Sequence, residues 1–262
     1  MAEVVRVFHA DSLAGPMREL KKAFEAKNKD VTIDLTTGVS KQLAERILKG
    51  ETCDVFASSS PAVIDAMFAQ QVAASKPAAS WYVVFSANEM VVIVEKGNPL
   101  GIQRLADLAK PGVRFIRVTG KADLATGRTI EFLNRAASRE GNPDLAATII
   151  NASPEDPAKP RPVPETVRAV AQRQANAGVV YYSAAVAARD EVDIIRFPRE
   201  VNLSEAIQNA ATVPGTAKSL NQATRFIQFL ISAEGQTILL ATGQPPVVPA
   251  VRKGQVPAGI NA

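Results

Sequence analysis

The chain is 262 residues long, 47% of them hydrophobic and 21% charged, which is enough to bury one large core or two smaller ones. The net charge of +4 favours small anions as ligands, but 5% aromatic residues and the lack of a lysine and arginine cluster argue against nucleic-acid binding. The single cysteine excludes an intramolecular disulfide. With one histidine and one cysteine, the chain has too few residues for a His/Cys zinc site and at most one Cys–His nucleophile pair. We therefore expect no nucleic-acid partner, no resident metal and no cofactor.

No apolar run in the sequence is long enough to cross a membrane. No signal peptide is visible, because Met1-Ala2-Glu3 leads directly into the first predicted strand. If the natural protein is exported, we expect its signal to be absent from this sequence. Cys53 lies inside the chain and is not a lipoprotein anchor.

The first predicted unit is a strand at residues 7–10, a short polar turn and a helix. Apolar residues recur at the helical spacing that gives one buried stripe: Leu13, Met17, Leu20 and Phe24. Ser12 stands where the helix N-cap is expected, and Pro16 in the first turn fits a helix start. Backbone N–H groups and the positive end of the helix dipole meet there, so the terminus is suited to bind an anion. An ordinary serine cap is the simpler alternative for this pattern alone.

The same pattern recurs twice more along the first third of the chain. A strand at 31–35 precedes a helix that starts near Ser40, and a strand at 54–57 precedes a helix with Ser60 as N-cap and Pro61 at its first position. This β-α-β-α-β-α order predicts a parallel sheet with helices on its faces. Ligands bind at the carboxyl ends of the strands in such sheets, where all three serine-bearing turns fall.

A second unit is predicted to begin near Ala87. Its expected strands and helices are strands at 90–95, 113–118, 177–182 and 194–197, and helices at 105–108, around 130–137 and at 165–174. The stretch 119–128 is expected to be a polar loop, and the proline-rich stretch 151–164 a surface excursion. The last third is expected to hold helices at 220–230 and 233–241, followed by a tail along the surface.

Pieces of the sequence also carry a family resemblance, and they run almost end to end: Phe8-His9-Ala10-Asp11-Ser12-Leu13, Gly38-Val39-Ser40, Asp54-Val55-Phe56-Ala57-Ser58, Val91-Val92-Ile93-Val94, Lys96-Gly97-Asn98-Pro99, Leu105-Ala106-Asp107-Leu108-Ala109-Lys110-Pro111-Gly112, Gly178-Val179-Val180-Tyr181 and Phe226-Ile227-Gln228-Phe229-Leu230 with its continuation to Gln236. In this order they resemble the periplasmic solute-binding proteins of ABC importers, in the molybdate/tungstate branch. No single piece is diagnostic, and the ordered set is more specific for the wider family than for the branch.

The resemblance implies an α/β, two-lobed type II periplasmic-binding-protein fold. Each lobe would be a mixed, mostly parallel sheet flanked by helices, with a ligand cleft between the lobes. Lobe 1 would comprise residues 1–87 and 204–262, and lobe 2 residues 88–203. The implied function is that of a monomeric, periplasmic or extracytoplasmic receptor, not an enzyme, that delivers its ligand to a membrane permease.

The family binds a tetrahedral dianion through serine hydroxyls, backbone N–H groups and a tyrosine. By position, Ser12 and Ser40 match the serines of lobe 1, Thr126 or its neighbour Ala125 a backbone donor, Val167 a backbone donor at a helix start, and Tyr181 the tyrosine. Such donors offset the cost of dehydrating a dianion, and their neutrality lets the ligand leave. Molybdenum or tungsten would enter only as the oxyanion.

One departure from the family leaves the ligand open. Asp11 stands where the family prefers a small neutral residue, and a carboxylate there repels an oxyanion unless it points away. The alternatives are the same fold binding sulfate, an organic acid or a metal chelate and, less favoured, an enzyme built on the two-lobed fold. A DNA-bound regulator is disfavoured further, since no helix-turn-helix segment flanks the binding lobes.

Overall fold

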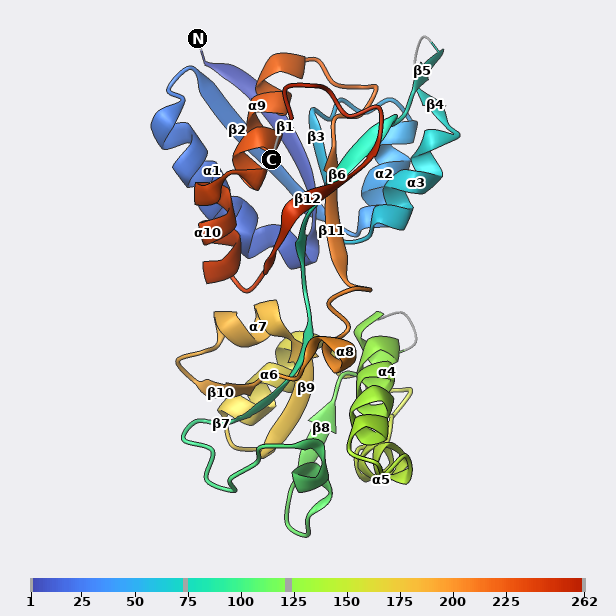
Figure 1. The fold of residues 1–262 in the computed structure, drawn as a ribbon, viewed down its shortest axis with the longest axis vertical. Helices are drawn as coiled ribbons and strands as arrows, with labels where there is room; N and C mark the ends of the chain where they lie inside the picture. The colour runs from blue at the N-terminus through green and yellow to red at the C-terminus, as the bar shows by residue number, and fades with distance from the viewer. Residues whose placement is uncertain (1, 73–74, 121–123, 261–262) are drawn as a thin grey trace. The chain divides into compact units, whose positions relative to one another are not determined.

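A computed structural model describes residues 2–72, 75–120 and 124–260 of the chain. It divides into two compact units: unit 1 comprises Met1–Ala87 and Ile207–Ala262, and unit 2 comprises Asn88–Ala206 (Figure 1). The sequence suggested a return to the first unit after residue 203, and the compact units divide after residue 206. The fold of each unit follows separately.

Unit 1 is built on a six-stranded sheet in the order β12-β6-β11-β3-β1-β2. Its strands are β1 (Glu3–Ala10), β2 (Val31–Gly38), β3 (Val55–Ser58), β6 (Trp81–Ala87), β11 (Gln208–Thr212) and β12 (Pro246–Gly254). A small hairpin, β4 (Gln71–Val72) with β5 (Lys76–Pro77), stands apart from it. β1 pairs in parallel with β2 and with β3, whereas β6, β11 and β12 pair antiparallel with their neighbours. The sheet is mixed, as expected, but antiparallel pairs outnumber parallel ones, because βα periodicity detects only the first three strands.

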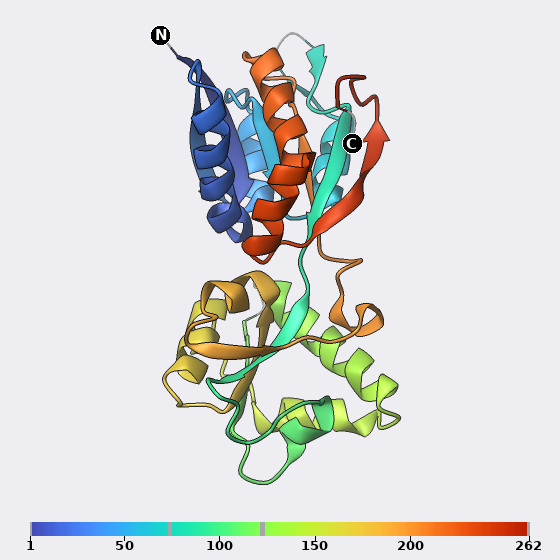
Figure 2. The ribbon, with the colours of Figure 1, turned by 60° about the vertical axis from the view of Figure 1, so that its left-hand side comes forward.

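Helices cover both faces of this sheet. They are the 3-10 helix η1 (Asp11–Leu13), α1 (Ala14–Lys27), α2 (Ser40–Leu48), α3 (Pro61–Phe68), α9 (Leu220–Ile231) and α10 (Ala233–Ala241). The stripe predicted for the first helix is buried against β1 and the C-terminal helices, where Phe24 contacts Phe226 edge to face. Figure 2 shows α1 and the C-terminal helices side by side over this face. α2 and α3 bury Leu43, Ile47 and Ile64 on the other face.

The expected surface tail is instead the edge strand β12 of the main sheet, paired with β6. Pro246 and Pro249 made the segment look irregular, but an edge strand tolerates residues that cannot donate to the ladder. The register shifts between Pro246 and Val251, so the prolines fall at an irregularity. The partner strand β6 is buried along its whole length, which the sequence pattern did not reveal.

Unit 2 contains a four-stranded sheet in the order β10-β7-β9-β8. Its elements are β7 (Met90–Glu95), the 3-10 helix η3 (Leu105–Ala109), β8 (Phe115–Arg117), α4 (Leu124–Arg139), α5 (Asp144–Ala152), α6 (Val163–Ala171), β9 (Ala177–Tyr181), α7 (Tyr182–Ala187), β10 (Val192–Ile195) and α8 (Arg199–Asn202). β8 and β9 are parallel, whereas β7 pairs antiparallel with both β9 and β10. The expected polar loop at 119–128 is helical from Leu124, and α5 was not predicted.

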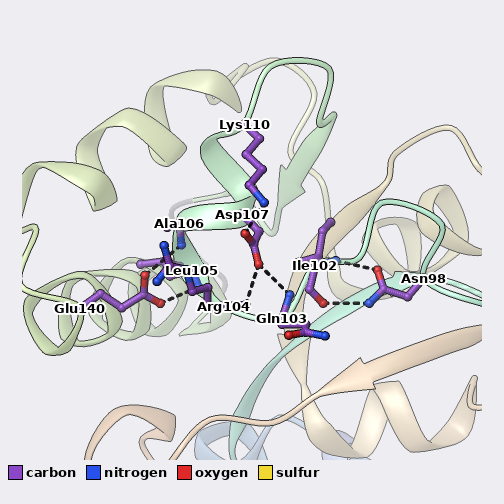
Figure 3. A network of polar contacts seen from close by, with 9 residues as sticks. All are labelled: Asn98, Ile102, Gln103, Arg104, Leu105, Ala106, Asp107, Lys110 and Glu140. Carbon is purple, nitrogen blue, oxygen red and sulfur yellow. Dashed lines mark hydrogen bonds and ion pairs between the residues drawn. The ribbon is translucent and has the colours of Figure 1, made fainter.

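The N-terminus of η3 is satisfied by carboxylates of unit 2 itself (Figure 3). Asp107 accepts hydrogen bonds from the backbone of Gln103 at 2.9 Å and Arg104 at 3.1 Å. Glu140, from the end of α4, accepts from the next two amides, Leu105 and Ala106, at 2.7 and 3.1 Å. Burial alone would raise the pKa of Asp107, but hydrogen bonds from Lys110 and the two amides outweigh it, so this pKa lies below its usual value.

Across the described ranges, every helix is too short or too polar to span a bilayer.

Candidate functional site

The carboxyl ends of β1, β2 and β3 form one edge of the unit 1 sheet, here called the serine edge. Parallel register brings Ala10 opposite Gly38, and His9 opposite Ala57. The turns that follow these strands therefore begin side by side and carry the serines singled out in the sequence: Ser12, Ser40, Ser58, Ser59 and Ser60.

Ser40 is the most closely held of these serines. It is the first residue of α2, it is 7% exposed, and its Oγ accepts a hydrogen bond from the backbone N–H of Ser59 at 3.1 Å. The two hydroxyls also lie 3.2 Å apart. The N-cap is Val39, which offers no side-chain acceptor to the first turn. In the described part of the chain no side chain takes the place of a cap, so N–H groups and hydroxyls gather at this terminus without a carboxylate.

Ser12 does not cap α1 as expected. It lies inside the 3-10 helix η1, and the N-cap of α1 is Leu13. One extra 3-10 turn separates β1 from α1. The sequence pattern indicates only where a strand gives way to a helix, so it does not predict this turn. The Ser12 side chain is exposed, and its backbone carbonyl accepts a hydrogen bond from Nε2 of the fully buried Gln244 at 3.0 Å.

Gln244 belongs to a buried polar network that fixes this turn to the sheet. Its Oε1 accepts from Nδ2 of Asn209 on β11 at 2.9 Å, and the same amide lies 2.9 Å from Oγ of Ser86 on β6. All three side chains are at most 1% exposed. The Ser12 turn is thereby held by residues of two distant strands.

Two titratable residues flank Ser12 on the serine edge. Asp11 is exposed and accepts a hydrogen bond from Oγ1 of Thr37 at 3.2 Å. His9 is buried, and its Nδ1 lies 3.0 Å from the carbonyl of Ala10. Burial lowers the pKa of His9 more than the carbonyl of Ala10 and the charge of Asp11 raise it. The imidazole is therefore neutral at pH 7 and donates from Nδ1.

The carboxyl ends of β8 and β9 form the corresponding edge of unit 2. Tyr181 ends β9, and its hydroxyl oxygen accepts a hydrogen bond from Nη1 of Arg128 on α4 at 2.9 Å. Oγ1 of Thr126, in the first turn of α4, donates to the carbonyl of Gly120 at 3.0 Å, while Ala125 is fully buried. Thr126, Arg128 and Tyr181 thus lie around one edge of this sheet.

Val167 does not occupy a helix start. α6 begins at Val163, with a proline among its first two residues, so Val167 is its fifth residue and its N–H is directed to the preceding turn. The expected start at 165 would have left this N–H unpaired. Its side chain packs against the core of unit 2.

Gln244 is the site residue that sequence reasoning did not single out, and Ser59 entered that reasoning only as part of a serine run. The run Ser58-Ser59-Ser60-Pro61 was a usable signal, since it follows a buried strand, but nothing local marks Gln244. In the described ranges no group of three or more His, Cys, Asp or Glu side chains is arranged to hold a metal ion. Both edges offer hydrogen-bond donors, namely hydroxyls, amides and the Arg128 guanidinium, and the serine edge also carries the Asp11 carboxylate.

Known proteins resemble the chain over nearly its full length. The molybdate-binding protein ModA of Mycobacterium bovis is 27% identical over 245 residues, covering 92% of this chain and 84% of that protein. The substrate-binding domain of a putative molybdenum ABC transporter from Clostridium difficile has the same fold, with a TM-score of 0.75 and 20% identity over 94% of this chain and all of that domain. The sulfate-binding protein SubI of Mycobacterium tuberculosis has the same fold with a TM-score of 0.64 and 19% identity. The match covers 94% of this chain and 88% of that protein.

The model of one family matches residues 5–245, most of the sequence. The fold is that of the two-lobed periplasmic binding proteins. The chain belongs to the bacterial extracellular solute-binding protein family.

Proposed function

We propose that this protein captures a tetrahedral oxyanion, molybdate or tungstate, and delivers it to the permease of an ABC importer. The observation that carries the proposal is the serine edge, where Ser40 and Ser59 meet at a helix N-terminus that has no carboxylate cap. The positive end of the helix dipole and the hydroxyl donors meet at this point, and together they favour binding of an anion.

The proposed ligand residues are Ser12, Ser40, the backbone at Thr126 or Ala125, and Tyr181. Taking a dianion out of water is costly, and several hydrogen bonds to it are needed to offset that cost. Hydroxyls and amides supply them without a full countercharge, so the ligand is released readily to the permease. Val167 is left out, because its N–H lies inside α6.

The family membership supports a receptor that works outside the cytoplasm and performs no chemistry on its ligand. The molybdate-binding relative from Mycobacterium bovis supports the choice of anion, and the likeness to the sulfate-binding protein makes sulfate the nearest competitor. A specific observation favours a second candidate, a ligand other than a bare oxyanion: the Asp11 carboxylate is exposed on the serine edge.

A ligand panel tests the proposal. Thermal unfolding is followed with molybdate, tungstate, sulfate, phosphate and citrate, and isothermal titration then gives the dissociation constant of each anion that binds. A ligand at a hundred times its dissociation constant stabilises the folded state by about 2.7 kcal/mol, so molybdate or tungstate should raise the melting temperature by several degrees. A shift with citrate and none with any tetrahedral anion would transfer the function to the second candidate.

A further inference from the structure

Arg128 is a charged residue on the edge of unit 2 where Tyr181 ends its strand. Its Nη1 donates to the Tyr181 hydroxyl oxygen over 2.9 Å, and its guanidinium carbon lies 5.7 Å from the centre of that ring. The side chain is half-buried. A cation is thus fixed at the tyrosine that we propose as a ligand of the anion.

Some other arginines of unit 2 form ion pairs with carboxylates. Arg135, two turns further along α4, pairs with Glu131 at 2.6 Å. Arg196 pairs with the buried Glu89 at 2.5 Å. Within the described ranges Arg128 forms no ion pair, and its hydrogen bond to Tyr181 uses one of five guanidinium N–H donors. Its charge and its remaining donors are therefore available to an anion.

We propose that Arg128 contacts the bound oxyanion directly and makes the site selective for doubly charged tetrahedral anions over singly charged ones. This inference rests on the proposed function and adds a cationic ligand to the neutral donors. A planar guanidinium fork matches two oxygens of one anion, and hydrogen bonds between charged groups are stronger than neutral ones.

A double-mutant cycle separates direct contact from an action through Tyr181. Molybdate affinity is measured by titration calorimetry for the original protein, Arg128→Gln, Tyr181→Phe and the double variant. Direct contact predicts that Arg128→Gln weakens binding by about tenfold or more in both backgrounds, because a hydrogen bond to a charged group is lost each time. If Arg128 only positions the hydroxyl, its replacement has no further effect once residue 181 is Phe, and that result would overturn the proposal.

Charge selectivity gives the second readout. Arg128→Gln should weaken molybdate more than perchlorate, a singly charged tetrahedral anion, and should flatten the dependence of molybdate affinity on potassium chloride. Arg128→Lys should restore part of both, because it keeps the charge without the fork. Arg168→Gln is the matched control. Arg168 is exposed on α6, and its replacement should change neither the selectivity for molybdate over perchlorate nor the salt dependence of molybdate affinity. Equal weakening of molybdate and perchlorate would contradict the proposal.

The same experiment distinguishes failure of this inference from failure of the proposed function. If the original protein binds molybdate, and Ser40→Ala weakens it while Arg128→Gln does not, the role of Arg128 is wrong and the function stands. If the original protein binds no tetrahedral anion, the function fails and this inference fails with it. The melting temperature of each variant without ligand shows that the comparison is made on folded protein.

Discussion

The N-termini of η3 and α2 satisfy their backbone N–H groups in different ways. At η3 the chain supplies two carboxylates, Asp107 and Glu140, and the four amides around the helix start all donate to them. At α2 the neighbours are the hydroxyls of Ser40 and Ser59, and the N-cap offers no side-chain acceptor. The start of η3 is thus satisfied by carboxylates of the chain, whereas the start of α2, where we place the ligand, is not.

A third N–H cluster, at the start of α9, lets this comparison be tested where the effect should be largest. The fully buried Asp54 accepts from the backbone N–H groups of Arg6, Lys218 and Ser219 at 2.8, 2.8 and 2.9 Å. Asp54→Ala leaves these donors without their acceptor, so the free energy of unfolding measured in urea should fall by about 3 kcal/mol or more.

Asp34→Ala is the control for Asp54, because Asp34 is exposed on β2 and its loss should change stability by about 0.5 kcal/mol at most. Equal stability of the two variants would mean that Asp54 does not act as an internal anion.

Glu140→Ala probes the same principle in unit 2. Leu105 and Ala106 lose the acceptor of their amides, and we expect a loss of about 1–2 kcal/mol in the free energy of unfolding. Glu131→Ala, on the same helix, removes only an exposed ion pair with Arg135 and should cost about 0.5 kcal/mol or less. Molybdate affinity should stay constant in both variants, and a weaker affinity in Glu140→Ala would break the division between structural and ligand-binding helix starts.

Two serines at helix starts sharpen the comparison further. Oγ of Ser232 accepts from the N–H of Gly235 and so caps α10, whereas Ser40 makes no such cap on α2. Ser232→Ala should therefore lower stability by about 1 kcal/mol and leave molybdate binding unchanged. Ser40→Ala should weaken molybdate binding by about tenfold. Titration calorimetry and urea unfolding of both variants measure the two effects. Weaker molybdate binding in Ser232→Ala, with unchanged binding in Ser40→Ala, would place the ligand elsewhere.

The smallest expected effect concerns pH. The ordinary pKa of histidine is about 6.5, and burial lowers that of His9 in the folded state. Below pH 6.5 the unfolded chain therefore binds a proton that the folded chain does not, so stability should decrease as the pH falls from 6.5 toward the folded pKa. His9 is the sole histidine, so His9→Gln should flatten urea-derived stability in this window. An unchanged slope would show that His9 titrates normally in the folded state.

Much of the fold could be predicted from local sequence patterns. The strand at 90–95 and the helix at 233–241 have the predicted bounds, and the start of α3, with Ser60 as N-cap, was confirmed. These elements are recognised because apolar spacing and capping residues act over a few positions. The extra turn at Ser12, the earlier start of α6 and the strand β12 were missed, because each depends on contacts outside such a window.

The sequence by itself determined that serines follow three strands whose carboxyl ends lie together, since parallel pairing of β1, β2 and β3 follows from alternating strands and helices. Only the tertiary structure decided the partners of those turns. Gln244 and Ser12 are hydrogen-bonded although 232 residues separate them in the sequence. The separation is 19 residues for Ser59 and Ser40, and 53 residues for Arg128 and Tyr181. The reason is physical: local spacing fixes which face a residue takes, whereas a hydrogen bond requires two groups within about 3 Å, which chain folding alone brings together.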